Sequence, residues 1–159
     1  MANEHLATYL NDHLAGSVVA LELLEHLEES YSETPLGRFF AELRADITAD
    51  REKLEALMGQ LEISESRTRQ ASAWLTEKLT ALKLRLDDPA DGDLRLFESL
   101  EALSLGIEGK RSLWLALSVV AERAPHLRLI DYQELIRRAE AQRSRVEEKR
   151  IETAKRALV

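Results

Sequence analysis

Long, uninterrupted stretches of helical periodicity constrain this chain more than any other feature. Only three prolines and six glycines punctuate its 159 residues, so the chain has few places to turn. Apolar side chains recur at gaps of three and four residues, which is the spacing of one face of an α-helix. Aromatic residues make up 5% of the chain, which leaves little from which to build strands. The pattern predicts an all-α protein.

Turn signals divide the chain into five predicted helices within a single domain, residues 1–159. Thr34 is a typical N-cap, and Pro35 suits the first helical position. The Asp- and Gly-rich run at 87–93 indicates a loop, and Pro125 ends the helix before it. The expected helices cover residues 3–31, 34–61, 65–86, 93–123 and 130–158.

Four of these segments are long and are joined by short turns, which favours an antiparallel four-helix bundle. The shorter segment, 65–86, is amphipathic and separates the two pairs of long helices. We therefore expect it to cross between two helical hairpins. Gly106 and Gly109 fall inside a long helix, where we expect them to allow close helix packing.

Each long helix carries polar residues near the middle of its apolar stripe, and mid-points of antiparallel helices lie at one level. We therefore predict one buried polar layer, which consists of His13, Ser17, Asp50, Glu101, Glu108 and Arg143. A buried charge must be paired, hydrogen-bonded or bound to metal. The layer is then either a salt-bridge network around Arg143 or a metal site. The candidate metal ligands are Asp50, Glu101, Glu108 and His13.

Two long hairpins with carboxylates at mid-height resemble the ferritin-like superfamily. Residues 10–24, LNDHLAGSVVALELL, are similar to the first helix of uncharacterised bacterial ferritin-like proteins. Residues 100–110, LEALSLGIEGK, are similar to their third bundle helix. The resemblance implies a ferritin-like bundle with a crossover helix, and it implies no particular activity.

Di-iron members of that superfamily bind metal through Glu-x-x-His motifs, and this chain has none. The residues three positions before its four histidines are Ala2, Leu10, Leu23 and Arg123. Arg143 carries a permanent charge and cannot ligate a metal. We therefore expect no cofactor, with iron or manganese as the alternative.

Net charge and composition limit the kinds of partner and location expected for this chain. A net charge of −7 opposes binding to nucleic acid, which needs a concentrated basic surface. The basic residues of the last helix alternate with glutamates, which is typical of a solvated face. The chain has no cysteine, no apolar run long enough to span a membrane and no recognisable signal peptide. We expect a cytoplasmic protein that binds neither nucleic acid nor membrane.

Some apolar residues lie outside the main stripes and predict a homodimer if they form one patch. They are Ala15, Val19, Leu23, Leu113 and Val120. No phosphate-binding loop, nucleophile elbow or metalloprotease signature occurs, so we predict no catalytic residue. We expect a non-enzymatic structural or interaction protein. The alternatives are an iron or manganese oxidase or storage protein, and a carrier of a small apolar ligand.

Overall fold

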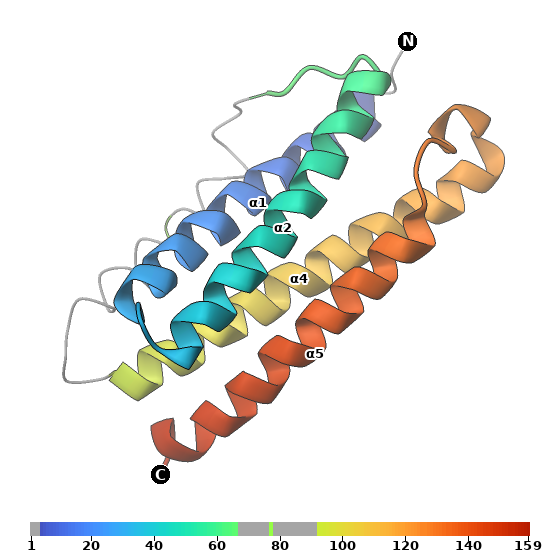
Figure 1. Ribbon diagram of the computed structural model, residues 1–159. Coiled ribbons are helices and arrows are strands. Elements are labelled where there is room, and N and C mark those ends of the chain that lie inside the picture. Colours follow the sequence, from blue (N-terminus) through green and yellow to red (C-terminus); the bar gives the residue numbers. More distant parts are fainter. Residues whose placement is uncertain (1–3, 67–76, 78–91) are drawn as a thin grey trace. The chain divides into compact units, whose positions relative to one another are not determined.

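The computed structural model describes residues 4–66, 77 and 92–159, and every regular element among them is helical. The elements are α1 (Glu4–Ser30), α2 (Pro35–Gln60), α4 (Gly92–Arg123), the short 3-10 helix η2 (Pro125–Leu127) and α5 (Tyr132–Ala157) (Figure 1). The all-α prediction is confirmed for these residues, which contain no strand. The long helices begin and end within two residues of the predicted bounds. The predicted crossover helix, 65–86, falls almost entirely outside the described residues.

The chain divides into two compact units, Met1–Lys83 and Leu84–Val159. The first holds α1 packed against α2, and the second holds α4 packed against η2 and α5. Each unit is thus built on one pair of long helices (Figure 1). The prediction of a single domain stays a prediction.

The turn between α1 and α2 is fixed by hydrogen bonds around Thr34. The Thr34 hydroxyl accepts a hydrogen bond from the Gly37 backbone N–H at 3.1 Å and donates one to the Tyr31 carbonyl at 2.6 Å. Pro35 begins α2, as expected for a residue without a backbone donor. The sequence signal at Thr34 and Pro35 therefore marks the start of a real helix.

Leucine-rich stripes from both helices form the core of the first unit. In α2 the buried residues lie where the periodicity predicted them, and they include Phe40, Leu43, Ile47, Leu54 and Leu57. In α1 they are Leu10, Leu14, Leu23, Leu24 and Leu27. Leu23 was predicted to lie on an exposed patch; this prediction is wrong, because the leucine is 3% exposed.

The Asn11 side chain links the start of α1 to the segment that follows α2. The Asn11 side chain donates to the Ser64 carbonyl at 3.2 Å and accepts from the Ser66 backbone N–H at 2.6 Å. These two bonds secure the segment that follows α2 to the start of α1. Asn11 is 7% exposed, so the bonds also satisfy a polar side chain that burial would otherwise destabilise.

In the second unit, α4 buries an apolar stripe that follows the helical periodicity expected from the sequence. Its members are Leu96, Leu100, Leu103, Ile107, Trp114 and Ala121. The connection to α5 is closed by Tyr132, whose hydroxyl donates to the Leu127 carbonyl at 2.6 Å, and by Asp131, which caps the Glu134 N–H at 3.0 Å. Burial raises the pKa of Tyr132, which keeps this phenol protonated as a donor.

One prediction about α4 is wrong: Leu113 is buried with 1% exposure, and so cannot belong to a surface patch. A Cβ at Gly106 or Gly109 would meet no atom of the described residues within 4 Å, so neither glycine serves close packing between α4 and α5. None of the described helices has an apolar stretch long enough to cross a membrane.

Gly37 gives a test of the first turn. A Cβ at Gly37 would lie 2.2 Å from the Tyr31 carbonyl oxygen, so the backbone itself would have to move. We expect Gly37→Ala to lower the free energy of unfolding by about 1 to 3 kcal/mol, the range for overpacking. The matched control, Gly106→Ala, has open space and should raise it by up to ~1 kcal/mol, because alanine is the better helix former. Urea unfolding followed by circular dichroism measures both, and a loss of similar size in the two variants would contradict the role of the turn.

Candidate functional site

The six residues of the predicted polar layer are shared between the two units. His13, Ser17 and Asp50 lie on α1 and α2, whereas Glu101, Glu108 and Arg143 lie on α4 and α5. That the two halves meet stays a prediction. Within each unit, the structure gives the surroundings of every member.

Asp50 lies in the apolar stripe of α2, one turn from Ile47 and one turn from Leu54. It is 2% exposed. A carboxylate at this depth needs a polar or charged partner to remain ionised.

His13 and Ser17 are half-buried on α1. The Tyr9 ring meets His13 edge-on, with ring centroids 4.7 Å apart. Burial lowers the pKa of His13, against the opposing effect of the Asp12 carboxylate. The Ser17 hydroxyl donates to the Leu14 carbonyl at 2.6 Å, so it is used within its own helix. His13 therefore has an aromatic neighbour and is biased towards the neutral imidazole.

Glu101 is not buried. Its side chain is 52% exposed and pairs with Arg150, whose Nη1 lies 3.3 Å from Glu101 Oε2. The physical reason is helical rotation: Glu101 follows the buried Leu100 by one residue, which turns it about 100° away from the core. The prediction that placed Glu101 in a buried layer is therefore wrong.

Glu108 and Arg143 lie at the margin of the α4–α5 interface. The Glu108 carboxylate accepts from Arg111 Nε at 3.1 and 3.2 Å and from Arg111 Nη2 at 3.0 Å. Arg143 Nη1 is farther away, 3.9 Å from Glu108 Oε2, and the Arg143 side chain is 43% exposed. The buried face of α5 includes Gln142, which moves Arg143 to its edge. Arg143 is therefore not the centre that the sequence predicted.

Arg150 instead binds carboxylates from both helices of this interface. Its guanidinium binds the Glu147 carboxylate through two hydrogen bonds, Nε to Oε1 at 2.9 Å and Nη2 to Oε2 at 2.7 Å. It also reaches Glu101 and lies over the Phe97 ring, with Cζ 5.6 Å from the ring centroid. Glu147 in turn accepts a short hydrogen bond from the buried Ser104 hydroxyl of α4. We call Arg150, Glu147, Glu101, Ser104 and Phe97 the Arg150 cluster.

The electrostatics of the cluster follow from this geometry. The two hydrogen bonds from Arg150 lower the pKa of Glu147 to about 2, and the Ser104 hydroxyl helps, whereas partial burial opposes the shift. Glu147 raises the pKa of Arg150 in return. At Glu108, the hydrogen bonds from Arg111 lower the pKa of the carboxyl group. Each carboxylate is thus held ionised by an arginine.

Sequence reasoning missed Glu147 and Arg150 as site residues. The alternating charges of the last helix predict a solvated face. In the structure the Glu147–Arg150 pair is three residues apart and only 29% and 22% exposed. The available signal was Ser104, a small polar residue on the buried side of the preceding helix, which could have indicated a charged partner. A second missed contact lies nearby, where the Lys110 ammonium donates to Gln142.

In this arrangement, arginine side chains hold the Glu147 and Glu108 carboxylates in place through hydrogen bonds. A carboxylate engaged by a guanidinium on both oxygens is a weak base, since its charge is already compensated. In the described ranges 4–66, 77 and 92–159, no three His, Asp or Glu side chains lie close enough to hold one metal ion.

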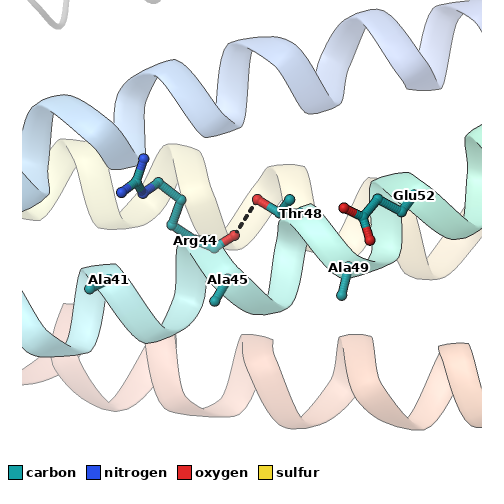
Figure 2. A pocket seen from close by; sticks show the side chains of 6 residues that line it. All are labelled: Ala41, Arg44, Ala45, Thr48, Ala49 and Glu52. Carbon is teal, nitrogen blue, oxygen red and sulfur yellow. Dashed lines mark hydrogen bonds between the residues drawn. The ribbon is translucent and has the colours of Figure 1, made fainter.

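A shallow hollow of about 330 Å³ lies on one face of α2 (Figure 2). Its described walls come from that helix alone, and they are Ala41, Arg44, Ala45, Thr48, Ala49 and Glu52. Arg44 also pairs with Glu28 of α1, with Nε 2.7 Å from Oε2. Sites for small molecules bury most of the ligand, and the described walls of this hollow, which lie on one helix, would not do so by themselves.

Comparisons with protein-family models, with curated proteins and with solved structures find no match for this chain.

Glu147 predicts a pH dependence of stability. Its pKa falls from 4.5 to about 2 on folding, so its stabilising effect is complete above pH 4.5 and is lost as the pH falls towards 2. At pH 7 we expect Glu147→Gln to lower the free energy of unfolding by about 1.5 kcal/mol, the low end for a hydrogen bond to a charged group. Glu148→Gln, at an exposed neighbouring position, is the control. Urea titrations at pH 7, 5, 3 and 2 measure the difference, which should disappear at the lowest pH; a difference that persists there would contradict the assignment.

Arg150 and Arg143 give a second test. We expect Arg150→Ala to destabilise by about 1 to 2 kcal/mol, since it leaves Glu147 without its bidentate partner. Arg143→Ala should stay within about 0.5 kcal/mol, because a loose, exposed ion pair contributes little. Thermal unfolding of both variants and of the parent protein decides the ranking. A larger loss at Arg143 would restore the sequence-based interpretation.

Proposed function

We propose that this chain is a non-enzymatic structural or interaction protein, in which arginine–carboxylate pairs occupy the level where di-iron proteins hold metal. The observation that carries the proposal is the Arg150 cluster. Arg150 binds Glu147 and Glu101, and Arg111 binds Glu108, with distances of 2.7 to 3.3 Å. Acidic side chains on α4 that would be sought as metal ligands are therefore already neutralised.

The proposal includes the ferritin-like architecture, an antiparallel four-helix bundle made from the two helix pairs. Contacts within the α4–α5 pair support it, because those that advance along α4 recede along α5: Asp93 meets Arg156, and Trp114 meets Tyr132. The α1–α2 pair is antiparallel as well, because Asn11 contacts Ser64 whereas Glu28, farther along α1, contacts Arg44, earlier in the chain than Ser64. Two such pairs with leucine-rich stripes are the usual components of a bundle. A cytoplasmic location is part of the same proposal.

Competition between cations supports the absence of a metal centre. A divalent ion at Glu108 or Glu147 would have to displace a guanidinium that already makes two or more hydrogen bonds. It would also lie close to Arg111, Arg143 and Arg150, whose positive charges oppose a second cation. A carboxylate site for iron or manganese requires the reverse, a surplus of negative charge.

Elemental analysis tests the proposal directly. The full chain is expressed with added iron and manganese, purified without chelator and analysed for both metals. We expect less than about 0.1 metal per chain, in the parent protein and in Asp50→Ala alike. About two metals per chain, lost in Asp50→Ala, would overturn the proposal and establish the metal-dependent alternative. Circular dichroism of the variant confirms that it is folded.

A further inference from the structure

A second group of charged side chains lies along the α4–α5 interface from the Arg150 cluster. It consists of Glu108 and Arg111 on α4 and Glu140 and Arg143 on α5, and we call it the Arg111 cluster. Two contacts join the helices there. Arg143 Nη1 lies 3.9 Å from Glu108 Oε2, and Arg111 Nη1 lies 3.6 Å from Glu140 Oε1. Each helix therefore contributes one glutamate and one arginine.

The two clusters correspond when α4 is followed forward by seven residues and α5 backward by seven. This shift takes the contact between Glu101 and Arg150 to the contact between Glu108 and Arg143. Seven residues are close to two helical turns, so both pairs lie at equivalent places on the facing helices. The residue types are the same, yet the nitrogen–oxygen distance increases from 3.3 Å to 3.9 Å. The clusters must therefore differ in what surrounds the arginine.

One position distinguishes the clusters. The same shift takes the contact between Ser104 and Glu147 to the contact between Arg111 and Glu140. Ser104 is small and uncharged, so it gives no glutamate a cationic partner. Arg111 is long and charged, and it binds Glu108 of its own helix with nitrogen–oxygen distances of 3.0, 3.1 and 3.2 Å. The Glu108 carboxylate is therefore occupied from within α4.

Arg143 shows the consequence of this occupation. Its side chain is 43% exposed, and its Nε is buried without a hydrogen-bond partner among the residues that the structure describes. A buried donor without a partner is unfavourable. Arg143 Nη1 is roughly 1 Å beyond hydrogen-bond distance from Glu108, which a change of rotamer can cover. We infer that Arg111 and Arg143 are alternative partners of Glu108: Arg111 excludes Arg143, and Arg143 binds when Arg111 is removed.

This exchange deepens the proposed function and rests on its claim that arginines neutralise the acidic side chains of α4. Removal of Arg111 would not make Glu108 available to a metal ion, since Arg143 would take its place. The electrostatics agree: hydrogen bonds from Arg111 lower the pKa of Glu108, partial burial opposes them, and the charge of Arg143 adds to the lowering. The two proposals can fail separately, because metal bound to the parent protein would contradict the first, whereas variants of Arg111 decide the second.

The pKa of the Glu108 carboxyl group tests the exchange. In Arg111→Ser, which copies the Ser104 position, the pKa should stay below 4.5, because Arg143 moves onto the carboxylate. In Arg111→Ser with Arg143→Ala it should rise to 4.5 or above. Arg111→Ser with Arg137→Ala is the matched control, since Arg137 is 64% exposed on α5 and pairs within its own helix, and there the pKa should stay low. NMR titration of the side-chain carboxyl carbon measures each value. A pKa of 4.5 in Arg111→Ser alone, or a low pKa without both arginines, would overturn the inference.

Unfolding equilibria give a second measurement. Arg143→Ala should raise the unfolding equilibrium constant by no more than about 2-fold in the parent chain, where its ion pair is loose and partly exposed. In the Arg111→Ser background the same change should raise it by about 5- to 10-fold, because Arg143 then binds Glu108 directly. Arg137→Ala should have equal effects in both backgrounds. Circular dichroism checks that every variant is folded. Equal effects of Arg143→Ala in the two backgrounds would show that the arginines act independently, and the exchange would be ruled out.

Discussion

The bidentate bond between Arg150 and Glu147 is the interaction on which the polar side of the second unit depends. It brings a carboxylate against the α4–α5 interface, where Ser104 is 3% exposed. Desolvation there would raise the pKa of Glu147, yet hydrogen bonds from Arg150 and Ser104 outweigh it and lower that pKa to about 2. The interface can therefore contain charge without neutralising it.

The same interaction limits the chemistry of the site. A carboxylate with so low a pKa does not accept a proton near neutral pH, so Glu147 is a poor general base. Arg150 also engages Glu101, and Arg111 engages Glu108. Along this side of α4 the acidic groups therefore act as fixed acceptors for arginine. The charge pattern favours a structural role for the interior of this helix pair.

The sequence predicted the helices well and the site only in part, for a physical reason. A stripe such as Phe40, Ile47 and Leu54 averages over many residues, so an error at one position does not change the face that is buried. A single polar residue has no such redundancy. Arg143 and Arg150 are seven residues apart and therefore lie on the same side of α5. Their partners distinguish them, because Arg150 binds both oxygens of Glu147, whereas Arg143 lies 3.9 Å from Glu108. The charged ends of long side chains are also hard to place from sequence, because they can point away from the direction of the Cα–Cβ bond.

Neighbouring residues of α4 therefore lie on opposite sides of the helix, in different environments. On the inner side, Ser104 must be small and polar to reach Glu147 on α5, while its neighbour Leu105 is turned about 100° outward and is 65% exposed. Nothing in the α4–α5 interface requires a leucine at that position, so packing within this unit does not explain it. Glu101 is 52% exposed and lies 3.3 Å from Arg150, so the charge network of the helix pair extends from the buried Ser104 to the surface of α4.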